Sequence, residues 1–243
     1  HHPTMKNRII YRQGDTITIV TSNTTSNKKI AEPKEKIIQT YHFSRSQYEN
    51  AQAKTTMREF FSHDGAVCMD CPFAVSNGAS LSACYTHKMM QYSGFLSSLR
   101  SIGKVTESFD DIPELCIDMY NDIVNLCWNR YVRFGTYGEP SLMPIDLIER
   151  ICMYCKNWTG YTHQWSKKPE YAPYFMASTH TEDEERIASL IGYRSFVASP
   201  ISIPKFISCP ASEEMGFKSN CSKCGLCSGT KGKGTKSVII LEH

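Results

Sequence analysis

Three cysteines separated by two residues each form the densest group of metal-ligating side chains in the sequence: Cys221-x2-Cys224-x2-Cys227. A fourth cysteine, Cys209, stands upstream and is followed by Pro210. Thiolates are soft ligands that suit zinc and iron–sulfur clusters. Two-residue spacing on a loop that contains Gly and Ser lets the thiols converge on one centre, as in iron–sulfur loops. We expect these four cysteines to hold a [4Fe–4S] cluster, and the alternative is a structural zinc site.

A second group of thiols lies earlier in the chain, where Cys68-x2-Cys71 is followed by Cys84 thirteen positions later. Pro72 and Gly78 mark the intervening segment as a loop. The three thiolates would hold a second cluster with one open iron, or they would join the later cysteines in one mixed ligand set. The alternative is that Cys84 packs in the core while Cys68 and Cys71 form part of a zinc site.

The other four cysteines are expected to pack rather than to ligate a metal. Cys116 and Cys127 fall on the apolar stripe of a predicted helix, where a free thiol behaves as a small hydrophobe. Cys152 and Cys155 lie three positions apart on another predicted helix. The histidines His1, His2 and His243 resemble remnants of a purification tag, and we assign them no chemistry.

Polar residues follow the predicted strands at positions where a β/α barrel carries its functional groups. In such barrels these groups gather at the C-terminal ends of the strands. We expect Glu139, His163 and His180 to contribute to cofactor binding, and Ser199 and Cys209 share the same predicted rim. Glu139 follows Gly138, which would allow a ligand amine to approach the backbone. Taken singly, His163 would be a half-buried residue bonded to the backbone, and His180 a helix cap.

The elements that position these residues follow from hydrophobic periodicity. Three- and four-residue spacing predicts helices over 110–130, 144–158 and 181–191. Alternating and β-branched segments predict strands over 16–20, 131–135, 160–165, 174–179, 194–198, 205–208 and 237–241. Strands that alternate with helices favour a parallel sheet. We therefore expect an α/β fold with a partial or irregular (β/α) barrel over residues 61–240, and residues 5–60 as a β-containing extension packed on it.

Composition limits the function further. The chain has 243 residues and 27 basic against 24 acidic residues, which leaves a net charge of only +3. The mean hydropathy of −0.36 and the absence of a long apolar run exclude a membrane protein. Eleven cysteines without an export signal favour thiolate ligands in a reducing cytoplasm over disulfides. The near-neutral charge argues against a partner bound mainly through phosphates.

Several segments resemble phage-encoded proteins with a radical-SAM-like barrel, the gene-product-eighty-eight-like family. They cover about residues 64–230 in order and are Cys68-Met69-Asp70-Cys71-Pro72-Phe73-Ala74, Ala83-Cys84-Tyr85, Arg133-Phe134-Gly135-Thr136-Tyr137-Gly138-Glu139-Pro140, Tyr161-Thr162-His163-Gln164-Trp165, Cys209-Pro210 and Cys221-x2-Cys224-Gly225-Leu226-Cys227. The resemblance implies a cluster-bearing β/α barrel that acts in the cytoplasm of an infected bacterium.

True radical-SAM enzymes are a looser match. Their cluster loop is Cys-x3-Cys-x2-Cys, whereas this chain has Cys-x2-Cys-x12-Cys at Cys68, Cys71 and Cys84. Gly138-Glu139 resembles the strand end that receives the amino group of SAM. If four cysteines drawn from both groups close a single cluster, no iron is open and SAM chemistry is not expected.

Three functions are therefore compared. The first is an iron–sulfur protein on a radical-SAM-like scaffold that works in electron transfer or redox sensing, with a redox partner or a small-molecule substrate. The second is a SAM-dependent radical enzyme built around Glu139. The third is a zinc-stabilised nucleic-acid-binding protein, whose flexible basic segment 231–236 would contact phosphates. We favour the first, with one [4Fe–4S] cluster or two.

Overall fold

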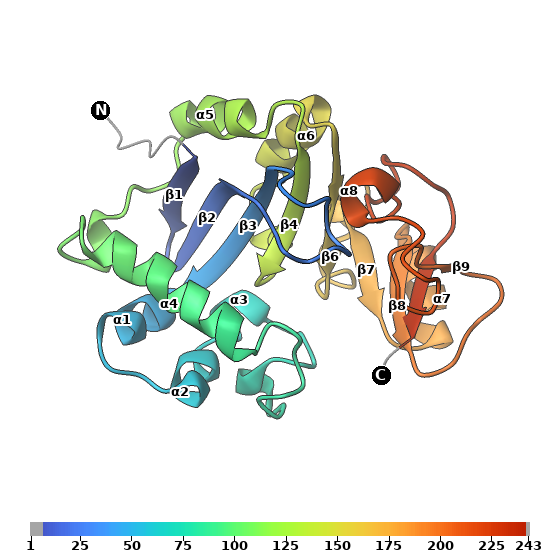
Figure 1. Cartoon of the computed structure of the whole chain (residues 1–243), viewed down its shortest axis with the longest axis horizontal. Coiled ribbons are helices and arrows are strands. Elements are labelled where there is room, and N and C mark those ends of the chain that lie inside the picture. Colours follow the sequence, from blue (N-terminus) through green and yellow to red (C-terminus); the bar gives the residue numbers. More distant parts are fainter. Residues whose placement is uncertain (1–6, 242–243) are drawn as a thin grey trace.

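The computed structural model describes residues 7–241, so the terminal histidines His1, His2 and His243 lie outside the described residues. Within this range the chain is a mixed α/β protein with two five-stranded sheets, in the orders β1-β2-β3-β4-β5 and β6-β7-β8-β10-β9 (Figure 1). The strands are β1 (Arg8–Gln13), β2 (Thr16–Asn23), β3 (Ile37–Ser44), β4 (Tyr131–Tyr137), β5 (Asn157–Thr159), β6 (Tyr161–Thr162), β7 (Met176–Thr179), β8 (Ser195–Ser199), β9 (Ile207–Ser208) and β10 (Val238–Leu241). The helices are α1 (Arg45–Gln52), α2 (Met57–Ser62), α3 (Gly65–Cys68), α4 (Met89–Gly103), α5 (Ile117–Cys127), α6 (Ile145–Tyr154), α7 (Glu182–Ile191) and α8 (Cys221–Cys224).

The first sheet begins as an antiparallel meander. β1 pairs with β2 and β2 with β3 in antiparallel register, and Gly14 makes the tight turn between β1 and β2 with a φ of 54°. β3 then pairs in parallel with β4, and β4 with β5. The strand expected at residues 16–20 is present within β2. Because β3 pairs with β4, the expected extension and the expected barrel share one sheet.

The second sheet is entirely parallel. β6, β7, β8, β10 and β9 pair in that order, with α7 connecting β7 to β8. Thr181 caps α7 by accepting from the backbone N–H of Glu184, and Gly192 ends the helix in a left-handed conformation. These are the boundaries that the sequence predicts for this helix.

A single chain segment joins the two sheets. β5 is the last strand of the first sheet and β6 the first strand of the second, and only Gly160 separates them. The Gly160 N–H donates to the carbonyl of Cys227, and its carbonyl accepts from the N–H of Met176. Residues 157–162 therefore contribute an edge strand to each sheet, and Gly160 interrupts the segment between the two strands.

The strands of residues 7–241 do not close into a barrel. β1 and β9 occupy the free edges of their sheets, and the chain begins with hairpin connections where a barrel would have βα units. The expectation of a partial barrel therefore reduces to two sheets that share an edge, one of them all-parallel. No helix in this part of the chain is long and apolar enough to cross a bilayer.

Some predicted boundaries are wrong. The helix expected over 110–130 begins only at Ile117, because Pro113 lies in its first part and removes a backbone donor. The helix expected over 144–158 ends at Tyr154, and Asn157 and Trp158 belong to β5 instead. The strand expected over 160–165 shortens to two residues, since its partner β7 offers only two pairing positions there.

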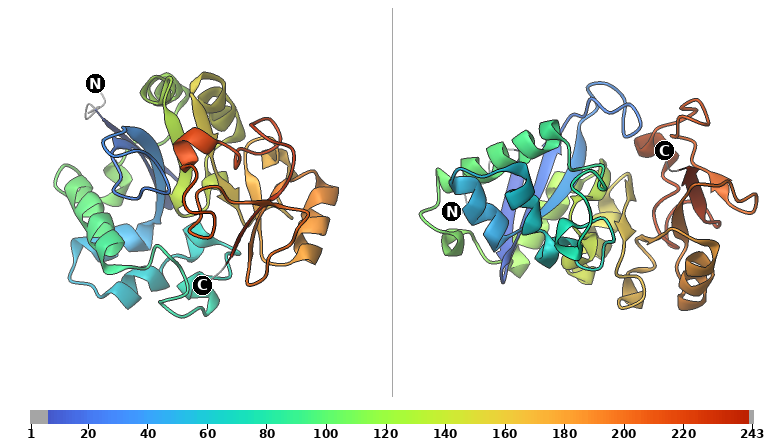
Figure 2. Two further views of the ribbon diagram at one scale, coloured as in Figure 1. Left: turned by 45° about the vertical axis from the view of Figure 1, so that its right-hand side comes forward. Right: turned by 90° about the horizontal axis from the view of Figure 1, so that it is seen from below.

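Helices cover both faces of the first sheet. α1, α2 and α4 pack on one face around Ile17, Phe43 and Phe95, whereas α5 and α6 pack on the other around Ile38 and Phe134 (Figures 1 and 2). This division follows the alternation of side chains along each strand. The segment 24–36 between β2 and β3 instead reaches the C-terminal loop, where Ile30 packs near Cys221.

Replacing Gly160 by Ala is expected to lower the free energy of unfolding by about 1–3 kcal/mol. An added Cβ would lie 2.5 Å from Cδ1 of Phe175, whose ring is fully buried. Urea denaturation would measure the change. The control is Gly94→Ala in α4, where a Cβ meets nothing within 4 Å and greater helix propensity is expected to stabilise the protein. Equal stabilities of the two variants would contradict a packing role for Gly160.

Candidate metal centres at the two cysteine groups

Four cysteines from two separate segments line one cavity. Cys209 follows β9, Cys221 and Cys224 lie on α8, and Cys227 follows that helix. Together with Thr159, Tyr161 and Val238 they line a small cavity of about 20 Å³. The structure therefore brings together the four thiols that the sequence grouped, and it places them against the shared edge 157–162.

Local hydrogen bonds shape the loop that carries three of these thiols. Asn220 caps α8 by accepting from the N–H of Lys223, and Gly225 ends it with a φ of 65°. The side-chain amide of Asn157 donates to the carbonyl of Ser222 at 2.6 Å. The N–H groups of Cys221 and Ser222 donate to the carbonyls of Lys29 and Ile30. β5 and the segment 24–36 thus hold the loop from two sides.

Burial raises the pKa of three of these thiols, those of Cys209, Cys221 and Cys227, so they stay protonated unless a cation joins them. It raises the pKa of Cys227 strongly and that of Cys221 to about 11, and the neighbouring thiols of the set raise both further. Cys209 is shifted in the same direction, again chiefly by burial. Thiolates gathered in one partly buried cavity are stable only if a positive centre compensates their charge. The donor set fits a metal centre that contributes this charge.

Two kinds of metal centre take four thiolate ligands. Within residues 7–241, no three Cys, His, Asp or Glu side chains converge tightly enough to bind a single metal ion. Four thiolates on one zinc ion would have sulfur atoms only about 3.8 Å apart. In a [4Fe–4S] cluster each thiolate binds a different iron, so the sulfur atoms lie farther apart. The cysteine lining supplies the ligand type that both centres use.

The earlier cysteines form a second group near α3. Cys68 ends α3, Cys71 follows in the loop, and Cys84 reaches both from the next turn of chain, close enough for electrostatic interaction. Burial raises the pKa of Cys71 to about 12 and that of Cys68 still more. Cys84 lies 3.0 Å from the hydroxyl of Thr86. The thiols that act electrostatically on Cys68 are Cys71 and Cys84, and those that act on Cys227 are Cys221, Cys209 and Cys224. This pattern favours two groups over one mixed set.

A buried carboxylate that sequence reasoning missed organises this loop. Asp64 is fully buried, and its two oxygens accept from the N–H groups of Val75 and Ser76 at 2.9 and 3.0 Å. Its backbone carbonyl accepts from the N–H of Cys68 at 2.7 Å. The only sequence signal is an Asp before Gly65, because its partners are eleven and twelve positions away.

Glu139 lies at the end of β4, as expected, but its carboxylate is already engaged. One oxygen accepts from the N–H of Ser141 and the other from the N–H of His163, at 3.2 and 3.0 Å. Burial raises its pKa, and Thr162, His163 and Ser141 oppose that shift by hydrogen bonding. Glu139 also interacts electrostatically with Cys71. It thus ties the end of β4 to the end of β6 beside the second cysteine group.

His163 and His180 meet at the rim formed by the ends of β6 and β7. Their rings are nearly parallel, with centroids 6.3 Å apart, and the ring of Phe73 meets His180 edge-on at 5.1 Å. The Nε2 atom of His163 is enclosed and has no hydrogen-bond partner within residues 7–241. The two histidines therefore share one rim with the loop of Cys71, whereas Ser199 caps a local turn at Ile201.

The remaining cysteines are placed outside these groups. Cys127 is fully buried among the side chains of α5 and α6, and Cys152 and Cys155 pack against the same core. Cys116 was expected on the apolar stripe, but it is exposed as the N-terminal flanking residue of α5. The late start of that helix after Pro113 turns it outward.

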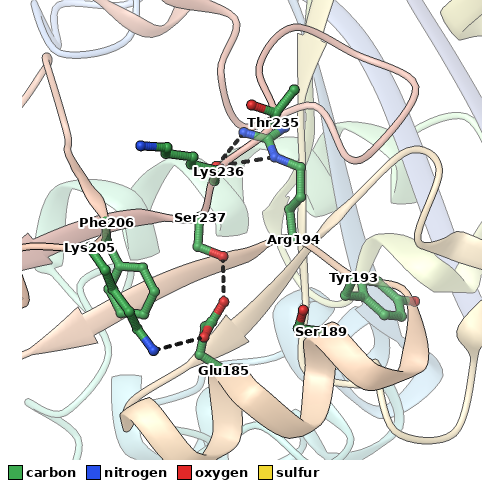
Figure 3. Close-up of a pocket in the computed structure, with 9 residues that line it drawn as sticks. All are labelled: Glu185, Ser189, Tyr193, Arg194, Lys205, Phe206, Thr235, Lys236 and Ser237. Carbon is green, nitrogen blue, oxygen red and sulfur yellow. Dashed lines mark hydrogen bonds and ion pairs between the residues drawn. The ribbon is translucent and has the colours of Figure 1, made fainter.

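The end of the basic segment 231–236 borders a separate hollow, which Thr235 and Lys236 line together with residues of α7 (Figure 3). Arg194 donates to the carbonyls of Lys236 and Gly229, and Lys205 pairs with Glu182 at 2.6 Å. Lys231 pairs with Glu149 at 3.1 Å. Protein carbonyls and carboxylates therefore engage Arg194, Lys205 and Lys231.

Comparisons with protein-family models, with curated proteins and with solved structures find no match to this chain.

The ring of His163 is expected to titrate near pH 4. Burial lowers its pKa to about 4, the neighbouring His180 lowers it further, and Asp70 raises it. The unfolded chain takes up this proton near pH 6.5, so folding stability is expected to fall as the pH drops from about 6.5 to about 4. His180→Gln should raise the pKa of His163, and Asp70→Asn should lower it, as measured by NMR titration of the ring protons. A lower pKa of His163 in His180→Gln, or a higher one in Asp70→Asn, would contradict the placement of these two residues beside the ring.

Proposed function

We propose that the chain is an iron–sulfur protein that holds a [4Fe–4S] cluster on Cys209, Cys221, Cys224 and Cys227. The observation that supports this most directly is that these four thiols, from segments separated by the loop 210–220, line one cavity. We further propose that the two joined sheets are an open, partial β/α barrel of the radical-SAM-like kind, with a reducing cytoplasm as its compartment. We also propose that the chain belongs to the gene-product-eighty-eight-like family of bacteriophage proteins.

The chain's own residues would hold and tune such a centre. A bound cluster supplies one-electron transfer. The N–H of Gly160 and the carbonyl of Cys227 anchor the loop to the sheet, and Tyr161 is a hydrogen-bonding neighbour of the Cys227 thiol. Burial around Cys227 excludes water. The hydrogen bond to the thiol and the exclusion of water both set the reduction potential of a cluster. Electron transfer to a redox partner or to a small molecule is the activity that this arrangement serves.

Substitution of Cys224 by Ser is expected to remove about four irons and four acid-labile sulfides per chain, together with the broad ~400 nm absorption band. The protein would be purified without oxygen and assayed for iron, zinc and sulfide. Cys116→Ser is the matched control, because Cys116 is exposed and outside both groups. Stoichiometric zinc without sulfide, or a Cys224→Ser variant with unchanged iron, would refute the assignment.

A second candidate function is SAM-dependent radical chemistry at the group of Cys68, Cys71 and Cys84. The specific observation in its favour is that three thiols gather beside Glu139 with no fourth cysteine of their own. Three thiolates leave one iron of a cluster open to a ligand.

This second candidate predicts about eight irons in the wild type and about four in Cys84→Ser. It also predicts that SAM changes the spectrum of the reduced wild type but not that of Cys84→Ser. About four irons in both proteins would reject it, and would leave the first proposal intact.

A further inference from the structure

A third group of thiols lies outside both candidate metal centres, where the ends of α5 and α6 meet. Cys127 is the last residue of α5, Cys152 lies in the last turn of α6, and Cys155 directly follows that helix. All three side chains belong to one core cluster. Cys155 is an electrostatic neighbour of both Cys127 and Cys152. Neither of the functions proposed above uses these thiols.

The turn after α5 holds the ends of the two helices together. The N–H of Asn129 donates to the carbonyl of Tyr154 at 3.0 Å. The N–H of Lys156 donates to the carbonyl of Arg130, also at 3.0 Å. The rings of Trp128 and Tyr154 stack on the surface, with centroids 5.2 Å apart. These contacts fix the last turn of α6 beside the end of α5.

The backbone around Cys152 and Cys155 meets the main geometric condition for a disulfide. The N–H of Cys155 donates to the carbonyl of Ile151 at 2.8 Å, as in a continuing helix. In helical backbone, Cα atoms three residues apart lie about 5 Å from each other, within the ~4.4–6.8 Å span that disulfides bridge. The Sγ atom of Cys155 lies 3.9 Å from the carbonyl oxygen of Cys152, and the two thiols are hydrogen-bonding neighbours.

The two thiols differ in their surroundings. Cys152 lies within the helix, and burial raises its pKa, which the neighbouring thiols of Cys155 and Cys127 raise further. Cys152 therefore keeps its proton at neutral pH. Cys155 is partly exposed at the end of the helix, between the exposed residues Tyr154 and Lys156. We expect a small molecule from solution to meet Cys155 first.

We propose that Cys152 and Cys155 form a redox-active dithiol that exchanges with low-molecular-weight disulfides. The Cys155 thiolate attacks one sulfur of the external disulfide and displaces the other as a thiolate. Cys152 then loses its proton and attacks Sγ of Cys155, which releases the second external thiolate. The two protons of the cysteines end on the released thiols, so the chain loses two electrons and the external disulfide gains them. In a reducing compartment such a bond is transient, as in catalytic or redox-sensing cysteines. The site does not require the cluster of the proposed function.

The first test uses the unaltered, folded protein. Trypsin cleaves after Arg150 and Lys156, so the single peptide 151–156 contains both cysteines and no other. The protein is incubated at increasing ratios of oxidised to reduced glutathione, and its free thiols are then alkylated. The disulfide is expected to exceed the glutathione adduct on this peptide by about tenfold or more, because the second thiol attacks within the chain. The exposed Cys116 is the internal control and should carry the adduct, since it lies outside every group of thiols.

Three results would overturn the proposal. They are a peptide 151–156 alkylated at both cysteines at every glutathione ratio, a stable glutathione adduct on it, or a cross-link from it to the peptide that contains Cys127. Iron measured on the same samples separates these outcomes from failure of the proposed function. The disulfide in protein that holds no iron supports the dithiol while rejecting the cluster.

Single variants test the order of attack. Cys152→Ala is expected to convert the disulfide into a glutathione adduct on Cys155, whereas Cys155→Ala should leave Cys152 with about tenfold less adduct than that. Cys116→Ser should not change the disulfide. If Cys152→Ala fails to fold, Cys155→Ala is compared with the adduct on Cys116 of the same protein. An adduct on Cys152 as abundant as the one on Cys155, or on Cys116 in that case, would refute the roles given to the two thiols.

Discussion

Much of this structure depends on the backbone hydrogen bonds of Gly160. Its N–H and carbonyl are bonded to different parts of the second half of the chain, Cys227 and Met176. Its neighbours on either side pair with β4 and with β7. One residue therefore fixes the two sheets relative to each other and anchors the loop of the four cysteines. A side chain at this position would collide with the ring of Phe175, which explains why the joint is a glycine.

The two cysteine groups rest on different supports. The four-cysteine loop lies against the segments 157–162 and 24–36, whereas the three-cysteine loop is held by Asp64 and by the backbone contact between Val67 and Glu139. Both supports include polar side chains that hydrogen-bond within the protein, Asn157 to the carbonyl of Ser222 and Asp64 to the N–H groups of Val75 and Ser76. Such networks hold loops firmly, because breaking one leaves a buried polar atom without a partner. Each group of thiols is thus positioned independently of the other.

The short-range features were predictable, and the long-range ones were not. The spacing at Cys221, Cys224 and Cys227 grouped these thiols, and the cap at Thr181 with Gly192 set the limits of α7. The sequence did not predict that Gly160 divides residues 157–162 into two strands, because strands of two or three residues are too short to show a periodic pattern. The role of Asp64 depends on backbone partners eleven and twelve positions further on, for which a single sequence contains no signal. The antiparallel start of the first sheet likewise follows from pairing rather than from pattern.

The contacts between the segment 24–36 and α8 have a consequence for folding. Glu32 accepts hydrogen bonds from Asn220 and Lys223, and Glu35 accepts one from Ser222, across 187–191 positions of sequence. Contacts of such high sequence separation form late, because the loop-closure entropy must be overcome before they contribute. During synthesis β2 and β3 emerge well before the residues that will cover their connection. The order of translation therefore favours docking of the last cysteine loop onto a first sheet that has already begun to form.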